Sequence, residues 1–103
     1  MTKKRLQPDD RKQQILTAAI RVAARPGGWA KLTRDAVARE AGCAEGLPSK
    51  YFGTMVNFKR AIMRAAIGAE NLAVIAQGLA AGDKSAQKAD ESLKRKALET
   101  LAG

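Results

Sequence analysis

Residues 32–52 have the sequence LTRDAVAREAGCAEGLPSKYF, which predicts two short helices separated by a glycine turn. Thr33 is a suitable N-cap for a helix over 34–41, in which three apolar residues recur at helical spacing: Val37, Ala38 and Ala41. Gly42 can adopt the left-handed conformation that ends a helix. A second helix, over 45–52, begins too soon for the two axes to lie parallel, and this spacing is typical of a helix-turn-helix.

The segment before this pair predicts another helix. It should run from Pro8 to about Ala24, where the sequence RPGG at 25–28 ends it. Trp29 and Leu32 lie in the connection that follows. Large apolar residues at such a place usually anchor the start of a helix to the core, and we prefer this role for Trp29 over stacking on a base.

Three more helices are expected after Phe52. The first should cover 54–67, because four apolar residues recur there at steps of three and four: Met55, Phe58, Ile62 and Ala66. The second should end at Gly82 and carries one apolar stripe: Leu72, Ile75, Ala76 and Leu79. Asp83 can cap the third, whose narrow seam comprises Ala86, Ala89, Leu93, Ala97 and Leu101, with Leu98 beside it. An Ala–Leu seam of this kind needs a partner surface.

Composition agrees with an all-α fold. The chain has 103 residues, of which 46% are hydrophobic and only 4% aromatic, so one modest core packed through small side chains is expected. The formal charge of +9 is unevenly distributed. Residues 1–60 hold 13 Lys/Arg against 5 Asp/Glu, whereas residues 61–103 hold 6 against 5. A polyanion is therefore the expected partner of the basic half that contains the helix pair.

Other classes of protein are disfavoured. The chain has no His and one Cys, and it contains neither a glycine-rich phosphate loop nor a metal-ligand spacing, so we expect no enzyme, cofactor or metal site. Cys43 is expected to be a small apolar residue near the core. No secretory signal follows Met1, and the apolar stretches are too short to span a bilayer. A soluble, cytoplasmic protein is expected.

These residues resemble the TetR-type transcriptional regulators. The matching pattern covers about residues 11–67: Ile15-Leu16-x-Ala18-Ala19, Gly28-x-x-x-Leu32-Thr33-x-x-x-Val37-Ala38-x-x-Ala41-Gly42 and Tyr51-Phe52. The chain is most similar to the short plasmid-borne repressors of the KorC kind, through its length and the Tyr-Phe-Gly-Thr-Met segment at 51–55. The resemblance implies a basic arm over 1–8, a DNA-binding helix-turn-helix head over 9–67 and a reduced dimerisation region over 68–103, with no small-molecule effector.

The resemblance also implies which residues contact DNA. Thr33 would meet a backbone phosphate at a helix N-terminus, and Arg34 belongs to the same DNA-binding set. Five residues match the recognition-helix positions that face the major groove: Glu45, Gly46, Leu47, Ser49 and Lys50. Tyr51 would contact phosphate, and Thr54 and Lys59 would hold the flanking backbone.

Two residues depart from the family pattern. Ala44, which belongs to the same DNA-binding set, stands where a Ser or Thr cap is usual. Pro48 stands where an apolar helix former is usual, and it disfavours helical geometry at the residue before it. We therefore expect the regular part of the recognition helix to begin near Leu47.

The residue types suggest how bases would be read. Lys50 can reach a phosphate or a guanine edge, Ser49 can hydrogen-bond to any base, and Leu47 can touch a thymine methyl group. Glu45 either accepts from a cytosine amino group or only complements the helix dipole, and both alternatives remain open. The basic residues at 3–5 either follow the DNA or form a solvated tail.

Together these observations predict a sequence-specific repressor that binds an inverted repeat in double-stranded DNA as a homodimer. The interface between copies is assigned to six apolar residues: Leu72, Ile75, Leu79, Leu93, Leu98 and Leu101. A non-specific architectural DNA-binding protein and a small basic protein–protein adaptor are the alternatives.

Overall fold

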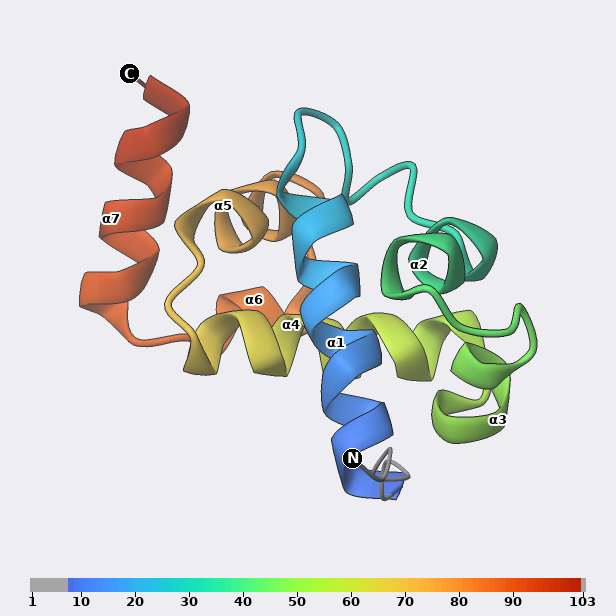
Figure 1. Ribbon diagram of the computed structural model, residues 1–103. Helices are drawn as coiled ribbons and strands as arrows, with labels where there is room; N and C mark the ends of the chain where they lie inside the picture. Colours follow the sequence, from blue (N-terminus) through green and yellow to red (C-terminus); the bar gives the residue numbers. More distant parts are fainter. Residues whose placement is uncertain (1–7, 103) are drawn as a thin grey trace, which may run out of the picture.

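The computed structural model describes residues 8–102, in which helices are the only regular secondary structure (Figure 1). Their bounds are α1 (Pro8–Ala24), α2 (Arg34–Ala41), α3 (Leu47–Phe52), α4 (Met55–Gly68), α5 (Leu72–Ala80), α6 (Lys84–Gln87) and α7 (Glu91–Ala102). The all-α expectation is confirmed, and the expected limits of the first, second and fourth helices agree with these bounds to within two residues. For the fifth helix the sequence predicts only an end at Gly82, and the helix ends at Ala80. The basic residues at 3–5 lie outside the described part of the chain.

The helices form an elongated molecule whose principal extents are 47, 25 and 21 Å. α1 packs against α2 and crosses α4, and α3 packs against α2 and the beginning of α4. α5 packs against α4, α6 and α7. Figure 1 places α2 and α3 at one end of the molecule and α7 at the other. The helix pair and the last helix, α7, therefore lie at opposite ends of one body.

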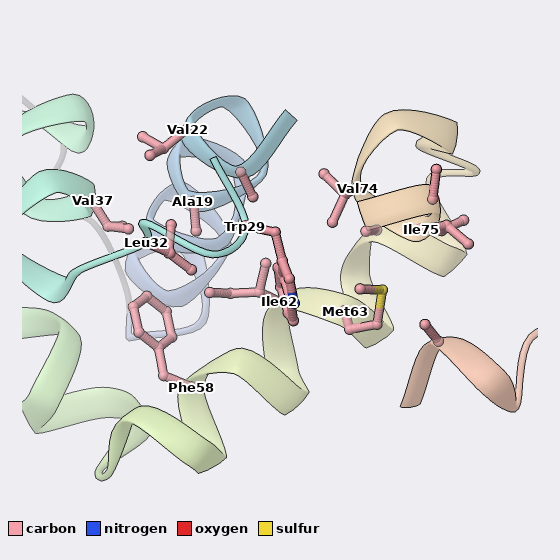
Figure 2. Packing of buried hydrophobic residues seen from close by; sticks show 14 of the residues in the cluster. Ala19, Val22, Trp29, Leu32, Val37, Phe58, Ile62, Met63, Val74 and Ile75 are labelled. Atoms are coloured by element: carbon pink, nitrogen blue, oxygen red, sulfur yellow. The ribbon is translucent and has the colours of Figure 1, made fainter. Parts of the chain in front are cut away.

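One hydrophobic core joins the two ends. Figure 2 shows Trp29 at its centre, beside Ile62 and between α1 and α5. Trp29 is 3% and Leu32 6% exposed, which confirms that the connection before α2 is anchored by its large apolar residues. The same cluster continues to Ala97 of α7, so residues 9–67 and the described residues after them share a single core.

Most helices begin at a polar residue whose side chain accepts a hydrogen bond from a backbone N–H of the first turn. Thr33, Thr54, Asn71 and Asp83 act in this way for α2, α4, α5 and α6. Gly68 is the last residue of α4, and the chain turns over Ala69–Asn71 before α5 begins. The cap at Asn71 is thus the local signal that separates these two helices.

The structure corrects the expected sixth helix, which is two helices rather than one. α6 ends at Gln87, and α7 begins only at Glu91. α6 packs against α4 and α5, whereas α7 packs against α5. The turn lets Ala86 and Ala97 both reach the core, where each is fully buried. Lys94 bridges the two helices, because its Nζ donates to the carbonyl oxygen of Gln87 at 3.0 Å.

Candidate nucleic-acid interface

The beginning of α2 is fixed by two hydrogen bonds. Thr33 Oγ1 accepts from the N–H of Ala36 at 3.1 Å, which leaves the hydroxyl hydrogen available to an external acceptor. Arg34 Nη1 donates to the carbonyl oxygen of Gly53 at 3.1 Å and ties the start of α2 to the end of α3. Arg34 is half-buried, and its guanidinium connects the two helices within the chain.

The turn between α2 and α3 has the geometry that the sequence predicts. Gly42 has φ 69° and ψ 33°, a left-handed conformation that is unfavourable for residues with a Cβ. The N–H of Cys43 donates to the carbonyl oxygen of Ala38 at 3.0 Å and closes the turn. Cys43 is half-buried against the core, as expected for a small apolar residue.

α3 is short because of Pro48. The helix begins at Leu47, its N-cap Gly46 has no capping side chain, and Pro48 is buried in the first turn. The expectation that regular helix begins near Leu47 is confirmed, since proline is tolerated in a first turn but disfavours helix before it. Six residues make a helix about 9 Å long.

Stacking of aromatic rings holds α3 on α4. The rings of Phe52 and Phe58 lie 5.0 Å apart between centroids, with 22° between their planes, and Phe58 is fully buried. Arrangements of this kind contribute about 0.5–1.5 kcal/mol beyond the area that they bury. The side of α3 that carries Ser49 and Lys50 faces solvent.

The residues expected to contact DNA fall into two groups. Seven are exposed: Thr33, Ala44, Glu45, Gly46, Ser49, Lys50 and Thr54. Four are half-buried: Arg34, Leu47, Tyr51 and Lys59. The exposed group comes from the start of α2, the turn, α3 and the cap of α4, which are neighbouring segments at one end of the molecule (Figure 1).

Two lysines of this set lie near aromatic rings. Lys50 Nζ is 5.9 Å from the centroid of the Tyr51 ring, at the limit of a cation–π contact. Lys59 Nζ is 4.5 Å from the centroid of Trp29, well inside that limit. The ammonium of Lys59 therefore contacts Trp29 within the chain, a contact that its expected role at the DNA backbone does not predict.

Contacts that the sequence did not indicate hold α2 against α1. Gln14 Nε2 donates to the carbonyl oxygen of Ala41 at 3.1 Å. The carboxylate of Glu40 accepts from Arg21 Nε at 3.3 Å and from Arg25 Nη2 at 2.6 Å. The hydrogen bonds from Arg25 and then Arg21 lower the pKa of Glu40 below its usual 4.5. These contacts fix α2, the helix before the turn, and they cannot be predicted from local sequence patterns.

A second set of long-range contacts joins the C-terminal helices to the same region. Gln77 of α5 donates from Nε2 to the carbonyl oxygens of Ala23 at 2.7 Å and Arg25 at 3.0 Å. Its Oε1 accepts from the N–H of Trp29 at 2.9 Å. One side chain thus satisfies three backbone groups of the connection between α1 and α2.

The structure corrects part of the expected dimer interface. Ile75 is fully buried and Leu93 only 8% exposed within the single chain, and Leu72 and Leu79 pack against the same core. Ile75 and Leu93 therefore belong to the core of one copy, whereas Leu72 and Leu79 are only partly buried there. Leu98 and Leu101 remain 49% and 54% exposed at the end that carries α7.

Residues 8–102 also bear on two other features, metal sites and membrane-spanning helices. This part of the chain contains no group of three His, Cys, Asp or Glu residues that could hold a metal ion. None of its helices combines the length and the apolarity needed to cross a bilayer. Comparison of the chain with protein-family models, curated proteins and solved structures found no match.

Proposed function

We propose that this protein is a sequence-specific DNA-binding transcriptional repressor that acts as a homodimer on an inverted repeat. The observation that carries the proposal is the exposure of Ser49 and Lys50 on α3, which follows the turn at Gly42 and whose C-terminal end is tied to α2 by Arg34. A short helix that protrudes from a rigid support can enter the major groove of duplex DNA.

The exposed chemistry suits duplex DNA. Lys50 offers an ammonium to a guanine edge or a phosphate, and Ser49 offers a hydroxyl to any base. The hydroxyl of Thr33, at the N-terminus of an eight-residue helix, suits a phosphate oxygen. Two acids, Asp35 and Glu45, are exposed nearby and would disfavour phosphates that approach them directly. This mixed pattern favours a defined orientation on DNA over binding by charge alone.

Leu98 and Leu101 support the homodimer. Two leucines that each expose about half of their surface on one helix form an apolar strip that a second copy can cover. Because a two-fold dimer presents two copies of α3, the half-sites should be centred one helical turn apart, about 34 Å, or a multiple of that distance.

Selection of bound fragments from a random DNA library, followed by footprinting, tests the proposal. We expect an inverted repeat that is protected at two half-sites. Uniform coating of DNA would instead support a non-specific architectural protein. Formation of a hetero-complex without affinity for duplex DNA would support an adaptor. Either result would refute the repressor.

Lys50→Ala tests the reading helix directly. If Lys50 contacts a base, the substitution should weaken operator binding by about 1–3 kcal/mol and leave random DNA less affected. Lys31→Ala, which removes an exposed cation from the connection before α2, is the matched control. An equal loss of affinity for operator and random DNA would show that Lys50 contacts only phosphate.

The dimer is tested by Leu98→Lys combined with Leu101→Lys. Light scattering should then report a monomer, because two charges would have to be buried in the interface. Val56 is 68% exposed at the start of α4, so Val56→Lys removes a comparable exposed apolar side chain elsewhere and should leave the dimer intact. A dimer that survives the double substitution would place the interface on another surface.

A further inference from the structure

A cleft between α4 and α6 gathers four cations. It has a volume of about 420 Å³ and is lined by Arg60, Arg64, Ile67, Lys84, Ser85 and Lys88. The two arginines are four residues apart on α4, and the two lysines are four residues apart across α6 and its C-cap. Residues at this spacing lie on the same side of a helix, so two pairs of cations line the two sides of the cleft.

These cations have no ionic partners in the described residues. None of the four takes part in a salt bridge there, and no acidic residue lines the cleft. Arg60 Nη1 makes only a long hydrogen bond of 3.4 Å, to Asn57 Oδ1. Two acids, Glu70 and Asp90, line the adjoining hollow, which shares Ile67 and Lys88 with the cleft.

The position of α6 is fixed by packing. Asp83 Oδ2 accepts from the N–H of Ala86 at 2.9 Å, so this nearby carboxylate is engaged in capping. Ala86 is fully buried against α4 and α5. The backbone that carries the two lysines is thereby held beside α4. The four cations are exposed at the two sides of the cleft, and an anion that binds between them reduces the repulsion among these like charges.

We propose that this cleft binds the phosphate chain of a small polyphosphate. Arginine forms paired hydrogen bonds to phosphate oxygens, and lysine ammonium groups complement the remaining charge. The concave shape and the short reach of each cation pair suit a few linked phosphates better than an extended double helix. The cleft uses no residue of α2 or α3, so the inference is independent of the proposed function.

Binding can be measured with inorganic tripolyphosphate by calorimetry and by shifts of backbone amide signals in NMR. At about 0.15 M salt, where charges separated by more than about 8 Å are screened, we expect saturable binding. The shifted amides should cluster around residues 60–67 and 84–88. Tripolyphosphate should bind about tenfold more tightly than orthophosphate, because it can engage both sides of the cleft.

Arg64→Gln combined with Lys88→Gln should weaken tripolyphosphate binding about tenfold or more, since half of the facing charge is removed. The matched control is Lys12→Gln with Arg95→Gln, which removes two exposed cations from α1 and α7. Tripolyphosphate should also raise the midpoint of thermal unfolding of the unmodified protein, and this rise should be smaller in the cleft variant than in the control.

Three results would overturn the inference. The first is an equal loss of tripolyphosphate affinity in the cleft variant and the control. The second is a set of shifted amides that centres on α2 and α3. The third is a cleft variant that binds tripolyphosphate normally but loses more affinity for random duplex DNA than the control does, which would assign these cations to the DNA backbone.

Discussion

Replacement of Gln77 tests how the two ends of the molecule are joined. Gln77→Ala removes the three hydrogen bonds to the backbone between Ala23 and Trp29. At about 0.5–1.5 kcal/mol for each bond, the gross loss is about 1.5–4.5 kcal/mol. The side chain regains rotamer freedom in the variant, and water can reach a half-buried site, so both effects reduce the loss. We expect a net decrease of about 2 kcal/mol in the free energy of unfolding.

Thermal and urea unfolding followed by far-UV circular dichroism, at one fixed protein concentration, would measure this decrease. For a chain of this size it corresponds to a fall of about 8–16 °C in the unfolding midpoint. Gln77→Glu should be destabilising as well, because a carboxylate cannot donate to the two carbonyl oxygens. Gln13→Ala, at an exposed position of α1, is the matched control. If Gln77→Ala were as stable as that control, the contacts of Gln77 would contribute nothing to the fold.

Three further predictions concern the support of the reading helix. Thr33→Ala should lower the free energy of unfolding by about 1 kcal/mol and Thr33→Ser should preserve it, as urea titration would show. The ion pairs that lower the pKa of Glu40 stabilise the fold at neutral pH, and this stabilisation is lost as the pH falls through that lowered value. The gap in unfolding midpoint between the protein and Glu40→Gln should therefore close on acidification, and a pH-independent gap would contradict this origin. Gly28→Ala should lower the unfolding midpoint strongly, because the added Cβ would collide with the carbonyl oxygen of Val22. At Gly46 an added Cβ would meet open space, so Gly46→Ala should leave the unfolding midpoint unchanged.

Local signals explain why much of the fold could be predicted. Helix α2 was bounded correctly because Thr33 and Gly42 act through hydrogen bonds within one turn of their own positions. Pro48 set the start of α3 for the same reason, since its ring restricts only the adjacent backbone. Asn71 is a comparable local signal for α5, because its side chain accepts from the N–H of Val74.

The remainder depends on distant contacts. An apolar stripe shows that a helix face is buried but not whether its own chain or another copy covers it, so Ile75 and Leu93 were assigned to a dimer although the chain's own core buries them. The break before Glu91 follows from packing α6 and α7 against different helices. Gln77 and Glu40 are ordinary surface residues in sequence, and their partners become visible only when the chain has folded.

The candidate DNA contacts come from the family resemblance and stay a prediction, but many of the exposed members lie beside capping and turn positions that are recognisable in the sequence. The sequence could not indicate that Lys59 lies against an aromatic ring, because Trp29 is brought there by the fold. The cleft between α4 and α6 could not be predicted from the sequence either. Arg64 and Lys84 belong to helices that are separated by all of α5.

The position of Lys59 over Trp29 gives the protein an intrinsic optical reporter. Trp29 is the only tryptophan in the chain, so its fluorescence can be observed without a label. The emission of an indole depends on the charges beside its ring, and here the ammonium of Lys59, a member of the candidate DNA-contacting set, lies 4.5 Å from the ring centroid. A ligand that draws this ammonium away from the ring would change the emission directly, and the signal would come from the interior of the protein.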